Sequence, residues 1–127
     1  MQRLVKKESD AKLLIAQQDR FINKPLKMLL NEIKPAIKYA YGEDAKDHGM
    51  PAYFTFKFVS KHQSDSLLHK GLANIVIQAY VKEKCIDWYE NKKRNKEPYF
   101  SWTDNDTRNY GSFTVIAIRV NDLFTVN

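Results

Sequence analysis

The sequence predicts an α+β fold in which a small antiparallel sheet of three to four strands packs against one long helix. Two observations predict the sheet: phenylalanines alternate through residues 52–60, and β-branched residues fill much of 110–120. One observation predicts the long helix, because apolar residues recur at three- and four-residue spacing from Ser66 to about Asn91. The expected order of elements is α-α-β-α-β-β.

Length and composition favour a single domain, spanning residues 1–127. The chain is 43% hydrophobic, which is enough for a core. It has no apolar run near the roughly 20 residues of a membrane span, and no secretory apolar region follows its basic start. The single cysteine, Cys85, cannot form an internal disulfide, which favours a reducing compartment. We therefore expect a cytoplasmic protein, or a virion protein if a phage encodes it.

Residues 1–42 are expected to be helical. Ser9 or Asp10 can cap a first helix over residues 8–22. A second apolar stripe starts at Pro25, which suits a first helical position, and continues to Gly42, a residue type that commonly ends helices. Pro35 lies inside this stripe and predicts a kink.

Residues 51–127 are expected to follow a β-α-β-β order. In the first strand, Phe54, Phe56 and Phe58 share one face, which we assign to the core. After the long helix we expect a basic linker over 92–97, a strand over 98–103, a polar turn over 104–109 and a strand over 110–120. The tail, 121–127, is expected to add a short edge strand.

The sharpest charge feature is a basic run at the predicted end of the long helix. The net charge is +6, from 21 basic and 15 acidic residues, and suits a polyanionic partner. The candidate phosphate-binding residues are Lys92, Lys93, Arg94, Lys96 and Arg108. The alternative is that cations gather there because a helix C-terminus favours them.

Aromatic residues are interleaved with basic residues along the predicted strands. Tyr53, Tyr99 and Tyr110 accompany Lys57 and Arg119, and such a strand face can stack bases. The alternative is ordinary packing of aromatic rings in a small core. The β-α-β-β-α-β order of the common sheet-based RNA-binding module is not predicted here.

No catalytic or metal-binding pattern stands out. The acidic loop with Glu43, Asp44, Asp47 and His48 lacks the alternation of a calcium loop, and we interpret it as solvated. The three histidines lack zinc-site spacing, and the glycines form no phosphate-binding loop. Cys85 falls within the predicted long helix, which indicates a buried, inert thiol. We therefore expect neither an enzyme nor a cofactor.

Two functional hypotheses follow, from different classes. The first is a structural or assembly protein that acts through protein contacts or self-association, such as a phage virion or head-to-tail connection component. The second is a small basic accessory protein of a phage or mobile element that binds nucleic acid. Neither hypothesis involves a membrane or a small-molecule substrate.

Overall fold

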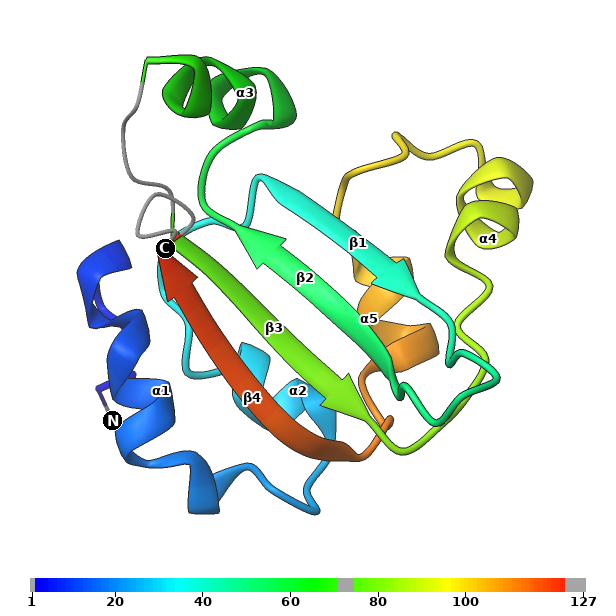
Figure 1. The fold of residues 1–127 in the computed structure, drawn as a ribbon, viewed down its shortest axis with the longest axis horizontal. Coiled ribbons are helices and arrows are strands. Elements are labelled where there is room, and N and C mark those ends of the chain that lie inside the picture. Colours follow the sequence, from blue (N-terminus) through cyan, green and yellow to red (C-terminus); the bar gives the residue numbers. More distant parts are fainter. Residues whose placement is uncertain (1, 71–74, 123–127) are drawn as a thin grey trace.

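The structure, a computed structural model, describes residues 2–70 and 75–122 and contains a four-stranded antiparallel sheet. The strands are β1 (Tyr39–Glu43), β2 (Ala52–Lys57), β3 (Ile75–Val81) and β4 (Val115–Asp122). They lie side by side in chain order, each antiparallel to its neighbour (Figure 1). The expectation of an α+β fold with a small antiparallel sheet is therefore confirmed.

Short helices lie behind this sheet and around its edges (Figure 1). They are η1 (Glu8–Lys12), α1 (Leu13–Ala16), η2 (Gln18–Arg20), α2 (Leu26–Leu30), α3 (Lys61–His69), α4 (Trp88–Asn95) and α5 (Asp104–Tyr110). Figure 1 shows α2 and α5 behind the sheet, α1 beside β4, and α4 beyond the β1 edge. In this view no described helix crosses the near face. Within the described part of the chain, no helix is long and apolar enough to cross a membrane.

The core lies between the sheet and the helices behind it. Phe54 and Phe56 are fully buried on β2, as their alternation predicts. The Phe54 ring contacts Trp88 and Trp102, with centroids 6.4 and 5.7 Å away, and also packs on Tyr110 at 5.2 Å. Because one face of β2 holds this aromatic cluster, the opposite face of the sheet is turned away from the core.

The predicted long helix over 66–91 is wrong. Its middle is strand β3, which pairs with β2 and β4, and helix reappears only at Trp88. The physical reason lies in Ile75, Val76 and Ile77, whose β-branched side chains favour a strand flanked by two others. A short, nearly continuous apolar run satisfies helical spacing as well as a buried strand, so periodicity alone misleads.

The prediction of a second helix from Pro25 to Gly42 is also wrong after Leu30. Helix α2 ends at Leu30, five residues before Pro35, and residues 39–43 form β1. Residues 1–42 are therefore not helical throughout. Gly42 does not end a helix but lies inside β1, where a Cβ atom would come within 2.9 Å of Ile86 Cγ2. The first predicted helix, over 8–22, is broken into η1, α1 and η2.

The elements after residue 92 differ from the prediction as well. The basic segment belongs to α4, residues 98–103 form no strand, and the predicted polar turn is helix α5. A capping box explains α5: Asp106 N–H donates to Thr103 Oγ1, and Asp106 Oδ2 accepts from the Thr103 N–H. The last strand begins at Val115 rather than Tyr110 and extends to Asp122. Residues 123–127, predicted as an edge strand, lie outside the described residues.

Candidate functional site

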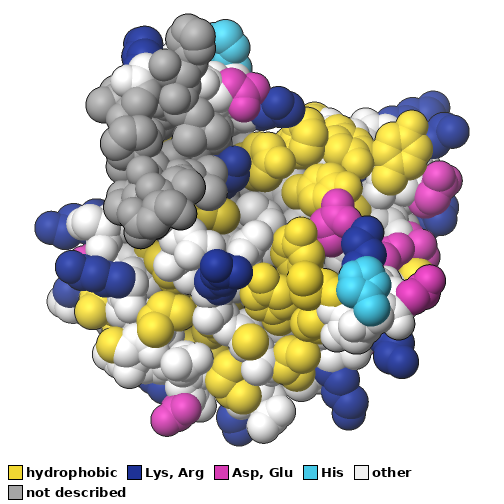
Figure 2. Space-filling view, viewed as in Figure 1, with side chains coloured by type: hydrophobic (Ala, Val, Ile, Leu, Met, Phe, Trp, Pro, Cys, Tyr) yellow, Lys and Arg dark blue, Asp and Glu magenta, His cyan; other side chains and the backbone are white. Residues whose placement is uncertain are grey.

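The face of the sheet that is turned away from the core carries all four tyrosines of the described strands. Strand register arranges its side chains in three rows that run from β1 to β4. The first row is Tyr39, Lys57, Val76 and Asn121; the second is Tyr41, Thr55, Gln78 and Arg119; the third is Glu43, Tyr53, Tyr80 and Ala117. We call this surface the open face. Figure 2 shows it with apolar side chains interspersed with a few basic ones.

Tyr53 and Tyr80 form the centre of the third row. They pair across β2 and β3, with ring centroids 5.2 Å apart and planes at 36°. Both side chains are partly exposed. Burial, and next the charge of Glu43, raises the pKa of Tyr53, so its phenol stays neutral at physiological pH. The pair therefore presents two adjacent aromatic rings to a partner.

Tyr39 begins the first row, and its ring contacts both Phe100 and Lys57. Its ring stacks on Phe100 at 4.9 Å and 13°, and Lys57 Nζ lies 4.6 Å from its centroid. Burial lowers the pKa of Lys57, the effect expected when an ammonium group leaves water. Phe100 is fixed by its backbone, because its carbonyl accepts from Ala40 N–H at the outer edge of β1. The 98–103 segment thus covers the edge of the sheet and adds a ring to the open face.

Tyr41 connects the open face to helix α4. Its ring packs on Tyr99 at 5.7 Å, and Tyr99 in turn contacts Tyr89 of α4 at 5.4 Å. A hydrogen bond to Glu43 is the main cause of a raised pKa for Tyr41, with burial next. Tyr89 is the most exposed of these rings, at 56%. A strip of aromatic rings therefore runs without a break from β1 onto α4.

The second row supplies hydrogen-bonding groups and a cation. Gln78 Nε2 lies 3.4 Å from Thr55 Oγ1, a long hydrogen bond across β2 and β3. Arg119 is exposed on β4, directly opposite Gln78. Amide, hydroxyl and guanidinium groups can all contact phosphate oxygens or base edges.

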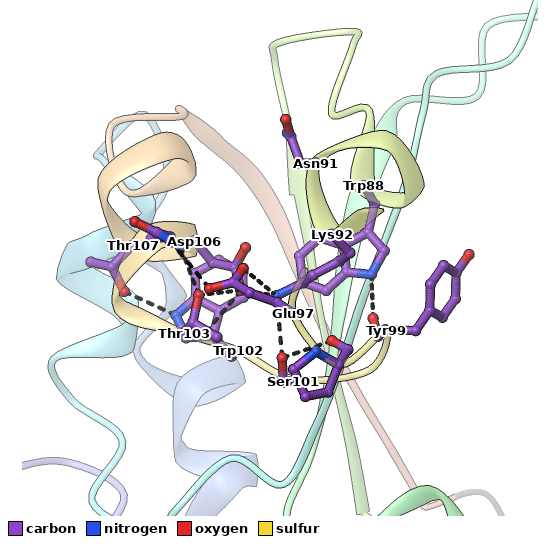
Figure 3. A network of polar contacts seen from close by, with 12 residues as sticks. Trp88, Asn91, Lys92, Glu97, Tyr99, Ser101, Trp102, Thr103, Asp106 and Thr107 are labelled. Atoms are coloured by element: carbon purple, nitrogen blue, oxygen red, sulfur yellow. Dashed lines mark hydrogen bonds and ion pairs between the residues drawn. The ribbon is translucent and has the colours of Figure 1, made fainter. Parts of the chain in front are cut away.

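Lys92, the first residue of the predicted basic cluster, is not at the surface. It is 2% exposed, and Figure 3 shows it between Asp106 of α5 and the Trp88 ring. Its Nζ pairs with Asp106 and lies 3.5 Å from Glu97 and 4.5 Å from the centroid of Trp88. A cation surrounded in this way joins α4 to α5 and cannot reach a phosphate. Its assignment as a nucleic-acid contact is therefore wrong.

The Lys92 network also fixes Glu97. Burial alone would raise the pKa of Glu97, but hydrogen bonds from Thr103 and Asn105 and the charge of Lys92 outweigh it and lower this pKa. Oε1 of Glu97 accepts no hydrogen bond within the described residues, so the Lys92 charge is what stabilises that oxygen. The carboxylate is therefore part of the structure of this corner rather than a reactive group.

The other predicted phosphate-binding residues are exposed on α4 and α5. Arg94 donates to Asn91 Oδ1 at 2.7 Å, and Arg108 donates to Asn105 Oδ1 at 2.5 Å. Lys93 lies one helical turn after Tyr89 and so shares its side of α4, with Lys96 beyond it at the helix end. The structure thus divides the predicted cluster, leaving exposed cations next to the aromatic strip.

Cys85 is exposed, so the expectation of a buried thiol is wrong. It lies in the loop between β3 and α4, and its Sγ is 3.2 Å from Asp87 Oδ2, a contact that raises the pKa of the thiol. Asp44 Oδ1 accepts from the N–H groups of Ile86 and Asp87. The ligand atoms of Asp44, Cys85 and Asp87 lie within 4.8 Å of one another. Asp44 therefore serves as a backbone cap here, and Asp87 is the hydrogen-bond partner of the thiol.

Tyr39, Tyr41 and Tyr80 were not predicted from the sequence as members of a common surface. The strands that carry them were assigned to helices, whose period places these residues on different faces. Two signals were available: alternation of Tyr39 and Tyr41 with small residues, and alternation of Gln78 and Tyr80 with Ala79. Of the predicted aromatic set, Tyr53 is on the open face, Tyr99 borders it and Tyr110 is buried in the core.

Comparison of the chain with protein-family models, with curated proteins and with solved structures finds no match.

Proposed function

We propose that this protein is a non-enzymatic binding protein that holds single-stranded nucleic acid on the open face. The observation that carries the proposal is the composition of that face: Tyr39, Tyr41, Tyr53 and Tyr80 lie on one side of the sheet with Lys57 and Arg119. The net charge of +6 supports a polyanionic ligand. Proteins that bind single strands combine these two elements, aromatic rings for bases and cations for phosphates.

A single strand suits this surface better than a duplex. Stacking on a protein ring requires an unpaired base whose flat side is accessible, and a duplex hides those sides. A duplex is usually read by an element that enters a groove, and none of the described helices crosses the open face (Figure 1). Each stacked base contributes about 1–3 kcal/mol and tolerates any sequence. We therefore expect weak sequence preference and strong salt dependence.

The test is fluorescence anisotropy with a labelled oligothymidine at low salt. Replacing both central rings, Tyr53→Ala with Tyr80→Ala, should weaken binding roughly 30-fold or more, because two stacking contacts are lost. The matched control, Tyr53→Phe with Tyr80→Phe, retains both rings and should bind within about threefold of the unchanged protein. An excess of unlabelled duplex should compete poorly.

Two results would contradict the proposal. One is failure of the unchanged protein to bind any single-stranded oligonucleotide at low salt. The other is full binding by the double alanine variant, which would show that the rings of the third row take no part.

A second candidate function, protein assembly, is favoured by one observation. Beyond Val115, strand β4 makes no backbone hydrogen bond to a described residue outside β3, although helix α1 packs beside part of this edge (Figure 1). Such an edge can pair with a strand of another chain. Two apolar side chains, Ile116 of β4 and Met50, are also exposed at the same end of the sheet.

A further inference from the structure

A cavity of about 510 Å³ lies at the end of the sheet, next to the third row of the open face. Ala52 and Val81 line it, and they directly adjoin the paired tyrosines Tyr53 and Tyr80 in the same two strands. We call this cavity the end pocket. Because the side chains of Ala52 and Val81 are buried on the core side of the strands, the end pocket lies beyond the end of the tyrosine pair and not in the same row of side chains.

Two loops form the end pocket, and backbone hydrogen bonds connect them. Ala45 N–H of the first loop donates to the carbonyl of Lys84 in the second at 2.9 Å, and Lys82 N–H joins the second loop to the carbonyl of Thr114, just before β4, also at 2.9 Å. Within the first loop, Lys46 N–H donates to the carbonyl of Met50 at 2.9 Å. The pocket is therefore framed by ordered backbone rather than by side chains alone.

The lining of the end pocket combines cations with an apolar floor. Its charged residues are Lys46, Lys82, Lys84 and Asp47. Lys46 lies 3.4 Å from Glu43, so part of its charge is already balanced, whereas Lys82 and Lys84 form no ion pair with any described residue. The apolar part includes Met50 and Ile116, exposed at 48% and 39%. This chemistry fits an anion that carries a flat or apolar body.

We propose that the end pocket takes the next nucleotide of a strand whose preceding base stacks on Tyr53 or Tyr80, with Lys82 and Lys84 contacting its phosphates. The inference rests on the proposed function and adds the path of the strand to it. Charge complementarity and continuity with the tyrosine pair favour this occupant over an unrelated ligand. The phosphates then leave the sheet between β2 and β3, away from the exposed lysines of α4.

The salt dependence of binding tests this path. For a single strand, the slope of log K against log salt changes by about 0.7 for each phosphate contact. Replacing two contacting lysines, Lys82→Gln with Lys84→Gln, should reduce the slope by about 1.4 and weaken binding roughly 25-fold at 0.1 M salt. Both lysines are exposed, so folding should be retained, and circular dichroism of the variant verifies this.

The matched control is Lys93→Gln with Lys96→Gln on α4. It removes two exposed lysines and lowers the net charge equally, so it accounts for any general charge effect. Its salt slope should stay close to that of the unchanged protein. If the salt slope falls in this control and not in the end-pocket variant, the phosphates lie over α4. That result would overturn the proposed path of the strand but not the proposal that the protein binds nucleic acid.

Two further outcomes are decisive. If the unchanged protein binds no oligonucleotide, the proposed function and the path fail together. An acidic decapeptide of glutamates serves as the second probe. The proposal is overturned if the unchanged protein binds this peptide and the Lys82→Gln, Lys84→Gln variant does not, while both bind the oligonucleotide with the same salt slope. The end pocket would then be a site for a protein partner.

Discussion

A buried lysine is the most consequential single residue of this fold. Lys92 carries its charge into a corner where Asp106, Glu97 and the Trp88 ring surround it. Removing charges from water costs several kcal/mol for each ion, and close partners offset that cost. The sequence does not reveal this, because Lys92 lies within a run of exposed cations. The one available clue is its position four residues after Trp88, on the same side of α4.

Removing this cation should destabilise the protein strongly. Lys92→Met should lower the free energy of unfolding by about 3 kcal/mol or more, because Asp106 and Glu97 then remain buried without their partner. The control Lys93→Met replaces the adjacent exposed lysine and should change stability by less than about 0.5 kcal/mol. Urea unfolding followed by tryptophan fluorescence measures both. Equal effects in the two variants would mean that the ion pairs of Lys92 contribute nothing to the free energy of unfolding.

Among the elements, β1 depends most on a small residue. Gly42 allows the strand to pass close to Ile86 and Trp88 at the start of α4, which we call the α4 corner. A Cβ atom at Gly42 would lie within 3.3 Å of Ile86, Phe54 and Trp88. The α4 corner in turn supports Tyr41 and Tyr99, which form the aromatic strip. The packing of one glycine thus affects the shape of the open face.

Adding one methyl group at this glycine should test that dependence. Gly42→Ala should lower the free energy of unfolding by about 1–3 kcal/mol, since the core must shift to accommodate the new atom. The midpoint of urea unfolding reports the change. A midpoint equal to that of the unchanged protein would show that β1 and the α4 corner separate easily.

The elements also show how far sequence patterns reach. Alternation of Phe54 and Phe56 predicts β2 correctly, because a half-buried strand leaves a period of two. Residues 75–81 are mispredicted, because Ile75, Val76 and Ile77 are apolar on adjacent positions and hide the period of two that begins at Ile77. Of the candidate site, the exposed cations of α4 and Tyr53 are predictable locally. The rows of the open face are not, since they depend on pairing between distant strands.

At the scale of the whole molecule, the open face and the β4 edge make different predictions for its mass. Nucleic-acid binding by the open face requires no second copy, so we expect a mass near 14.9 kDa in light scattering at both low and high salt. Oligonucleotide should increase that mass only at low salt. A defined multimer that neither salt nor oligonucleotide changes would favour assembly instead.

If a multimer forms, one substitution identifies its contact. Ile116→Lys places a charge on β4 and should dissociate a multimer that is joined through this edge. The control Met28→Lys places the same charge on α2, where the methionine is similarly exposed, and should leave the mass unchanged. Equal loss of mass in both variants would exclude the β4 edge as the specific contact.

The order of the strands also has a consequence for how the chain folds. β1 and β2 are joined by the short loop 44–51, whereas β3 and β4 are separated by the whole stretch from 82 to 114. Closing a longer loop costs more conformational entropy before any contact repays it, so the β1–β2 hairpin should form early and β4 should pair last. Until it does, the backbone of β3 is without its second neighbour. Molecules caught at that stage during refolding present a strand edge to one another, and refolding yield should therefore fall as protein concentration rises.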